Sequence, residues 1–263
     1  MRIASWNINS VRLRLDGLAR LASEYRPDVI CLQEIKVENG GFPAEEFATL
    51  GYPHLALNGV RAYHGVAIAS RLPLTDCGSM QWCARDDGRH VFATLRSGVE
   101  VHNFYVPAGG DVADPDVNPK FAHKLQFLDD LALWCSTLPR DGARRVLVGD
   151  LNVAPLETDV WSHRQLLKVV SHTPAEVERL EAVMAAHCWV DAVRHVIPPE
   201  QRLYTWWSYR ARDWAASDRG RRLDHAWITP ALLPALGGAT VVREARGWPR
   251  PSDHVPVLID LSL

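Results

Sequence analysis

The stretch from Val146 to Pro155 (Val-Leu-Val-Gly-Asp-Leu-Asn-Val-Ala-Pro) constrains the fold more than any other part of the chain. Its three leading apolar residues predict a short strand that is buried on both faces. Gly149 then allows the backbone to turn or to approach a neighbouring segment closely. Because side chains two apart on an extended chain point to the same side, we expect Asp150 and Asn152 to face one cleft.

Two interpretations of Asp150 and Asn152 are open at this point. A carboxylate beside a carboxamide suits metal-assisted phosphate chemistry, since carboxylate oxygens bind magnesium and an amide can donate to a phosphoryl oxygen. The same two side chains could instead cap a turn by bonding to their own backbone. The choice between a catalytic pair and a capped turn depends on the rest of the chain.

The length and composition indicate a soluble globular protein that works in a reducing compartment. With 263 residues and no linker or low-complexity stretch, we expect a single domain over residues 1–263. No signal peptide or membrane span is visible, so we expect a cytoplasmic protein. The odd number of scattered cysteines, without a CxxC pair, argues against disulfides and zinc: Cys31, Cys77, Cys83, Cys135 and Cys188.

Strand and helix patterns follow each other along the whole chain. Apolar or alternating runs predict strands at 2–9, 29–32, 52–57, 64–70, 90–96, 99–106, 146–148, 223–228, 239–243 and 255–261. Helical spacing predicts helices at 10–25, 43–50, 118–138, 161–170 and 174–186, with a short one after Pro230. The close spacing of the strands between 52 and 106 favours antiparallel meanders over repeated βαβ units.

Polar residues that could carry chemistry stand near the ends of these predicted strands. Surface acids would not track strand ends so regularly, whereas ligand sites in layered α/β proteins favour the carboxyl ends of strands. Carboxylates to bind a divalent cation, a histidine to activate water and amides or a phenol to meet negative charge are the parts of a phosphodiesterase. The residues are Asn7, Glu34, Tyr105, Asp150, Asn152, Asp224, Asp253 and His254.

Residues 202–222 have the most unusual composition in the chain. Six arginines against two aspartates leave a local charge of +4, although the whole chain has a formal charge of only −2. Arginines interleaved with tryptophan and tyrosine suit a nucleic-acid surface, because guanidinium groups hold phosphates while aromatic rings stack on bases. A solvated loop over a tryptophan-rich core is the alternative.

Taken in order, the motifs resemble the exodeoxyribonuclease III family (AP endonucleases) within the endonuclease/exonuclease/phosphatase superfamily. They lie between residues 6 and 254 and occur in the family's order. They are Trp6-Asn7-Ile8-Asn9, Leu32-Gln33-Glu34-Ile35-Lys36, Phe42-Pro43, Gly88-Arg89, Asn103-Phe104-Tyr105-Val106-Pro107, Gly149-Asp150-Leu151-Asn152-Val153, Arg219-Gly220-Arg221-Arg222-Leu223-Asp224-His225 and Ser252-Asp253-His254.

The resemblance implies an α/β (α+β) four-layer αββα sandwich, with two packed mixed β-sheets flanked by helices. It implies a nuclease dependent on Mg²⁺ or Mn²⁺, with one or two ions. Such an enzyme would be a 3′→5′ exodeoxyribonuclease on duplex DNA, an abasic-site endonuclease and a 3′-end phosphatase. We therefore expect double-stranded DNA with an abasic site or a blocked 3′ end as the partner. We also expect a monomer that contacts no membrane and associates with the nucleoid when on DNA.

The resemblance also implies roles for individual residues. The expected catalytic residues are Tyr105, Asp150, Asn152, Asp224 and His254, with either Asp150 or His254 taking the proton from water. The expected metal ligands are Glu34, Asn7 and Asp253, with Asp150 and Asn152 at a second position. The expected DNA contacts are Arg89, Lys120, Trp206, Trp207, Arg210, Arg222 and His172.

One departure from the family bears on substrate choice. Relatives often carry a small residue and then Phe before the helix at Pro174, whereas this chain has Ser171-His172. His172 could obstruct an abasic pocket or add a phosphate contact, so exonuclease activity is the safer expectation. Two other functions stay open: a phosphatase for lipid or inositol phosphates, which the arginine-rich segment argues against, and a DNA-binding protein without catalysis.

Overall fold

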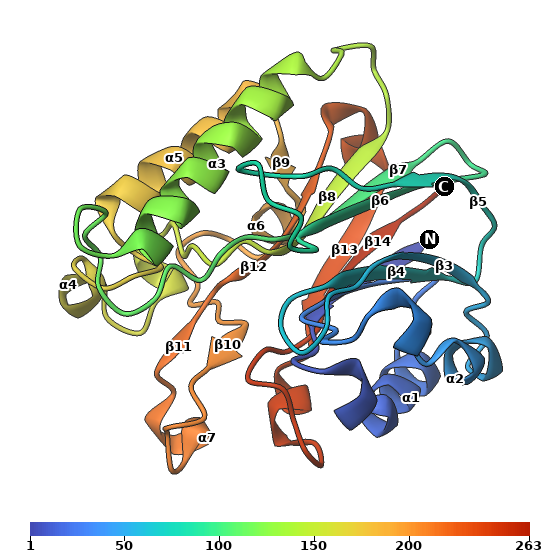
Figure 1. Ribbon diagram of the computed structural model, residues 1–263, viewed down its shortest axis with the longest axis horizontal. Helices are drawn as coiled ribbons and strands as arrows, with labels where there is room; N and C mark the ends of the chain where they lie inside the picture. The colour runs from blue at the N-terminus through green and yellow to red at the C-terminus, as the bar shows by residue number, and fades with distance from the viewer.

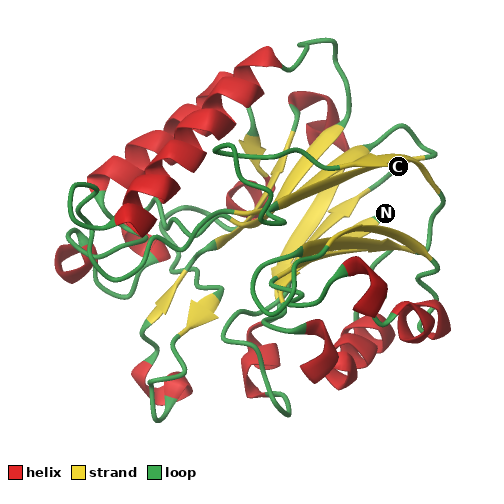
Figure 2. Cartoon of the chain, viewed as in Figure 1, coloured by secondary structure: helices red, strands yellow, loops and turns green.

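Two six-stranded β-sheets packed face to face form the centre of the protein, and helices cover both outer faces (Figures 1 and 2). The computed structural model describes all residues, 1–263. The first sheet contains, in spatial order, β13 (Leu236–Val241), β14 (Val257–Leu261), β1 (Arg2–Asn7), β2 (Val29–Gln33), β4 (Val66–Ser70) and β3 (His54–Asn58). The second contains β5 (Leu74–Gly78), β6 (His90–Leu95), β7 (Glu100–Tyr105), β8 (Arg145–Asp150), β12 (Asp224–Ile228) and β9 (Val190–Asp191).

Both sheets are mixed, as the family resemblance implied. The pairs β1–β2 and β7–β8 are parallel, and the remaining neighbours are antiparallel. The predicted four-layer sandwich is confirmed.

The central strand β8 shows why its sequence is continuously apolar. Val146 and Val148 point into the core between the sheets, where they pack with residues such as Val29 and Ile68 of the first sheet. Leu147 points the other way, into a second core beneath the outer helices. Because both faces of β8 are covered, every position in the strand excludes water, as the Val-Leu-Val run predicts.

Each outer face carries its own helices. On the first sheet these are α1 (Leu15–Glu24) and α2 (Ala44–Thr49), and on the second the long α3 (Pro119–Thr137) and α5 (Pro174–Ala186), which lie side by side (Figure 1). Asn118 caps α3, since its side chain accepts a hydrogen bond from the Lys120 amide. The shorter α4 (His163–Leu166) and α6 (Ala192–Val196) lie in connections. None of the helices is long and apolar enough to cross a membrane.

Several predicted boundaries were wrong for local reasons. The helix expected from Ser10 starts at Leu15, because Ser10 has a positive φ of 87° and a short 3₁₀ turn intervenes. The helix expected at 161–170 shrinks to α4, because Trp161 donates its amide to Gly220 of a neighbouring extended segment. Strand β5 was missed because it is a mostly exposed edge strand with a polar sequence.

An arm formed by residues 206–221 projects from the body of the sandwich (Figure 1). It consists of the hairpin strands β10 (Trp206–Trp207) and β11 (Gly220–Arg221), with the short helix α7 (Trp214–Ser217) between them. At its base Trp206 forms a β-bridge with His254, so the arm is tied to the segment that precedes β14. The arginine-rich segment thus combines a short hairpin and one helical turn with irregular turns between them, and Trp207 and Trp214 pack on the core of the first sheet.

Asn103 of β7 links the two sheets through buried polar contacts. Its side-chain amide donates to the backbone oxygens of Leu32 and Ala67 in the first sheet, at 2.9 Å each. Its side-chain oxygen accepts a hydrogen bond from Gln33 Nε2 at 2.7 Å. Since these groups are buried, slippage between the sheets would leave them unsatisfied.

The close approach of β8 to β7 at Gly149 leaves no room for a side chain. It has a φ of 143°, and a Cβ at this position would lie 1.9 Å from the backbone oxygen of Phe104. We expect Gly149→Ala to lower the free energy of unfolding by about 3 kcal/mol or more. Gly40→Ala, where an added Cβ meets nothing within 4 Å, should change it by less than about 0.5 kcal/mol. Equal urea midpoints for the two variants would contradict this account.

Candidate active site

The polar residues predicted from strand ends meet at one edge of the sandwich. Asn7 ends β1, Glu34 follows β2, and Tyr105 and Asp150 end β7 and β8. Asp224 begins β12, but β12 runs antiparallel to β8, so Asp224 lies directly opposite Asp150. Residues from both sheets therefore lie at one site.

Asn7 joins the acids of the two sheets. Its side-chain amide donates to Glu34 Oε1 at 3.0 Å and to Asp150 Oδ2 at 2.8 Å. Tyr105 donates its hydroxyl to the same Glu34 oxygen at 2.9 Å. Burial alone would raise the pKa of Glu34, but the hydrogen bond from Asn7 and the ammonium of Lys36 lower it overall. Glu34 is thus held ionised and oriented.

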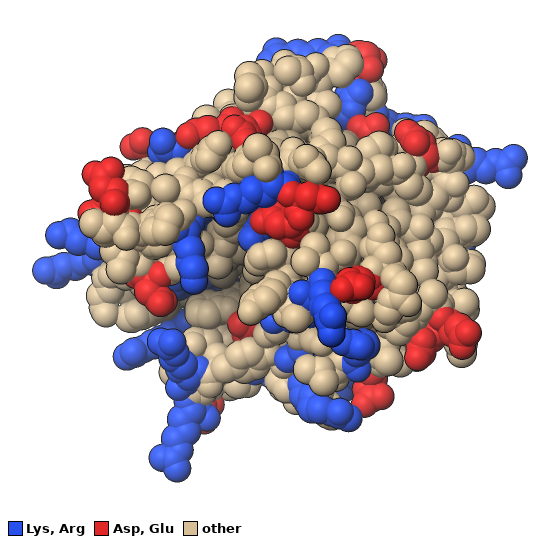
Figure 3. Space-filling view, viewed as in Figure 1, with Lys and Arg blue, Asp and Glu red and all other residues tan.

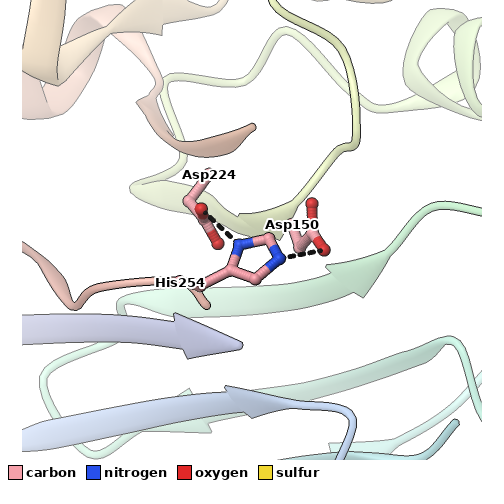
Figure 4. A group of neighbouring side chains, drawn as sticks. All are labelled: Asp150, Asp224 and His254. Carbon is pink, nitrogen blue, oxygen red and sulfur yellow. Dashed lines mark hydrogen bonds and ion pairs between the residues drawn. The ribbon is translucent and has the colours of Figure 1, made fainter. Parts of the chain in front are cut away.

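His254 lies between two carboxylates (Figure 4). Its Nδ1 is 2.8 Å from Asp224 Oδ2, and its Nε2 is 3.6 Å from Asp150 Oδ2. Burial lowers the pKa of His254, but the carboxylates of Asp224 and Asp150 outweigh it and leave the pKa raised. Burial raises the pKa of Asp150, and the opposing charge of His254 offsets this only in part. The two carboxylates therefore favour the imidazolium form of His254, and burial makes Asp150 more basic than an ordinary carboxylate.

Thr205 orients Asp224 and, through it, His254. No feature of the sequence indicated this role. Its buried hydroxyl accepts hydrogen bonds from the amides of Leu223 and Asp224, at 3.0 and 3.1 Å. Both lone pairs are then used, so the hydroxyl hydrogen is directed at Asp224 Oδ2, 2.6 Å away. Asp224 Oδ1 is buried without a partner, which leaves Oδ2 as the oxygen that holds His254.

Behind Asn152, a fully buried ion pair supports the loops of the site. Lys124 donates to the backbone oxygen of Asn152 at 2.7 Å and pairs with Glu176. Glu176 in turn accepts hydrogen bonds from the amides of Ser171 and Thr173. Asn152 has a positive φ of 55° and donates its side-chain amide to Val106 O at 2.9 Å. One of its two amide hydrogens stays available to a ligand.

A cavity of about 980 Å³ extends from the acids along the base of the arm. Figure 3 shows this face hollowed between the outer helices and the arm, with basic side chains at the margin of the hollow. One wall contains the acids and His254, and the other contains arginine and tryptophan side chains. The lining includes Glu34, Tyr105, Asp150, Asn152, Asp253, His254, Trp161, Trp206, Arg210, Arg212, Arg219 and Arg221.

Four of the expected DNA contacts are buried, which contradicts a direct contact from this conformation. Trp207 packs in the core and donates to Asp218, and Arg222 is fully buried in ion pairs with Asp159 and Asp191. The ring of His172 lies between Ala154 O and His163, so it does not obstruct the cavity, which Ser171 lines instead.

Arg89 is the fourth of these residues. Its guanidinium pairs with Asp87, donates to the backbone oxygen of Tyr105 and lies over the Tyr105 ring. It therefore positions Tyr105. Trp206 and Arg210 line the cavity, and Lys120 is exposed at the start of α3.

Glu34 and Asp253 offer carboxylate oxygens, the ligands that a hard divalent cation prefers. Lys36 Nζ lies 2.9 Å from Glu34 Oε2 and 2.6 Å from the side-chain oxygen of Asn9. Asn9 also donates to Asp253 Oδ1 at 3.1 Å, so a cationic group already sits in the region that joins these two carboxylates. Asn7 uses its amide hydrogens on the acids, and its oxygen accepts from the Asn9 amide, so it orients ligands in this conformation.

Asp150, Asp224 and His254 also lie within 4.8 Å of one another, close enough for a shared ion. A hydrogen bond of 2.8 Å between Asp224 and His254 Nδ1 occupies two of these groups, however. They form a proton-holding dyad beside Asp150. Carboxylates for a cation, an imidazolium and a cavity with basic and aromatic walls together define a phosphoesterase for a polyanionic substrate.

Comparison with known proteins agrees with this class. Residues 4–254 match the Endonuclease/Exonuclease/phosphatase family. Exodeoxyribonuclease III of Haemophilus influenzae is 26% identical over 98% of each chain. An AP endonuclease from Archaeoglobus fulgidus superimposes with a TM-score of 0.92 at 31% identity, and the 3′-5′ exonuclease NExo from Neisseria meningitidis with 0.91 at 32%, each over 100% of both chains.

The chain therefore belongs to the endonuclease/exonuclease/phosphatase family, in its exodeoxyribonuclease III and AP endonuclease branch, and is a hydrolytic DNA-repair nuclease.

Removing the Thr205 hydroxyl should impair turnover through Asp224. We expect Thr205→Val to lower kcat by about 10-fold or more with little change in KM, because Thr205 does not line the cavity. Thr205→Ser keeps the oxygen and should stay within about threefold of the wild type. Steady-state kinetics on a DNA duplex check both values, and equal kcat for the two variants would contradict the role of the hydroxyl.

Asp150→Asn should separate stability from activity. The pKa of Asp150 is higher in the folded protein than in the unfolded chain, where a carboxyl has a pKa of about 4. The free energy of unfolding therefore falls as the pH rises above about 4 and Asp150 ionises. Asparagine stays neutral, so the melting temperature of the variant relative to wild type should increase from pH 4 to pH 8. Turnover should fall about 10²-fold or more. A relative melting temperature that falls with pH would refute the raised pKa.

Proposed function

We propose that the protein degrades duplex DNA from 3′ ends, incises abasic sites and removes 3′-phosphates, with a divalent metal. The observation that carries this proposal is His254 held between Asp224 and Asp150 in a cavity with arginine and tryptophan walls. The names of the similar proteins cover all three activities. His172, the residue that made abasic-site incision doubtful, lies outside the cavity lining.

The proposed chemistry gives Asp150 and His254 different tasks. Asp150, the more basic carboxylate, takes a proton from water, because His254 already holds its own between two acids. His254 then offsets the negative charge that develops on the phosphate, with Asp224 fixing its ring. Asn152 and Tyr105 donate hydrogen bonds to phosphoryl oxygens.

Glu34 and Asp253 are the proposed metal ligands, with Asp150 and Asn152 available to a second ion. The cation, Mg²⁺ or Mn²⁺, would supply Lewis-acid polarisation of the phosphate when bound. Asn7 orients Glu34 and Asp150 through its two amide hydrogens. The Lys36 ammonium keeps Glu34 ionised. Its positive charge would also repel a cation that binds to Glu34.

Double-stranded DNA is the proposed substrate, with Trp206, Arg210 and Lys120 as contacts. Trp206 and Arg210 line the cavity, and a basic, aromatic wall suits phosphates and unstacked nucleotides better than a lipid surface. A phosphatase for lipid or inositol phosphates is therefore not favoured. We further propose that residues 1–263 form one nuclease domain that acts as a monomer, because both sheets of a single chain supply the site. Its proposed location is the cytoplasm, on the nucleoid when it is bound to DNA.

One labelled duplex that contains an internal abasic analogue tests the activities together. We expect Mg²⁺-dependent shortening from the 3′ end and a second product cut at the analogue, and both should vanish with chelator. Glu34→Gln should shift the Mg²⁺ titration to higher concentration because one ligand charge is lost. Cleavage that persists in chelator, or an unchanged titration, would exclude the proposed metal site.

A further inference from the structure

Arg221 lies on the cavity wall, two strands away from His254. It pairs with Trp206 in the arm hairpin, and Trp206 forms a β-bridge with His254. Two inter-strand spacings place the Arg221 backbone roughly 10 Å from that of His254. Arg221 therefore lines the same cavity as His254 but is displaced from it along the cavity wall.

The guanidinium of Arg221 is held in place while part of it stays free. Its Nη1 donates to the backbone oxygen of Val170 at 2.9 Å and to Ser171 Oγ at 2.8 Å. The group also lies over the Trp206 ring, 5.3 Å from its centroid. Nη2 makes no hydrogen bond to the protein, and Nε is buried without a partner. The side chain is pre-oriented, and its donors are not used up.

The charge of Arg221 is not compensated within the protein. Its neighbour Arg222 is ion-paired with two aspartates, whereas Arg221 forms no ion pair. The carboxylate that acts on it, Glu176, is already paired with Lys124. Burial lowers the pKa of Arg221, as expected for a half-buried cation that lacks a counter-charge. Such a group is stabilised when an anion enters the cavity.

We propose that Arg221 is a second phosphate site, which binds a phosphate of the DNA strand next to the phosphate being cleaved. The inference rests on the proposed nuclease function and adds a defined contact to it. A planar, charged guanidinium binds a phosphate more strongly than it binds a neutral sugar, because its paired N–H groups match two phosphate oxygens. Its contact fixes the direction of the strand through the cavity, while the acids and His254 act on the neighbouring bond.

The test counts phosphate contacts by the salt dependence of binding. Duplex binding is measured from about 50 to 200 mM salt in the Asp150→Asn background, where cleavage is suppressed. Each phosphate contact contributes about 0.9 to the slope of log K against log salt, so Arg221→Gln should lower the slope by about one. Arg96→Gln, the same charge change at an exposed turn between β6 and β7, should leave it unchanged.

Two further variants keep the test decisive. Arg221→Met retains contact with Trp206 and should lower the slope as Arg221→Gln does, even if the glutamine variant does not fold. Arg221→Lys keeps the charge and should retain the slope with weaker binding, because the planar fork is lost. A slope that is unchanged in Arg221→Met, or lowered equally in Arg96→Gln, overturns the proposal. Wild-type binding without metal-dependent cleavage would instead contradict the proposed nuclease and leave this readout intact.

Discussion

The active site depends on the relative position of two sheets, and a few buried polar contacts set that position. Asn103 reaches across the core to the backbone of β2 and β4, while Gln33 returns a hydrogen bond to it. Apolar packing alone tolerates small sliding motions, but a buried amide that loses its partners is costly. Glu34 belongs to one sheet and Tyr105 to the other, so their 2.9 Å hydrogen bond depends on this register. The chemistry is therefore assembled by the sandwich, and neither sheet holds a complete site.

Charge compensation differs between the buried supports of the site and two of the groups that face the cavity. Buried ions that support structure are paired inside the protein, as Lys124 is with Glu176 and Arg222 is with Asp159 and Asp191. Glu34, which lines the cavity, is also paired, with Lys36. Asp150, by contrast, has a raised pKa, and Arg221 has no counter-ion. Incomplete compensation costs folding free energy and is retained where a ligand supplies the missing charge.

The sequence predicted the strand ends well and the arm poorly, for physical reasons. Buried strands such as β8 have strong apolar patterns, and polar residues at their ends converge because the strands share one edge. The hairpin β10–β11 has only two residues in each strand, too few for a pattern, so neighbouring arginines could not be assigned to its two faces. Arg222 was expected at the DNA and is buried, whereas Arg221 faces the cavity. Thr205 acts through hydrogen bonds between distant segments, which no local spacing encodes.

The base of the arm is a ladder in which Val160, Arg221, Trp206 and His254 are joined by successive β-bridges and pairs. The tip, residues 208–219, lies beyond this ladder (Figure 1) but still contacts the body of the protein. Tyr209 of the tip accepts a hydrogen bond from Asn9, which also donates to Asp253, and its hydroxyl donates to the backbone oxygen of Pro251. Asp218 pairs with Arg243 on the body of the protein. Exchange of the tip would therefore remove contacts to the two chain segments that flank Asp253, so the arm and the bond-breaking groups form one mechanical unit.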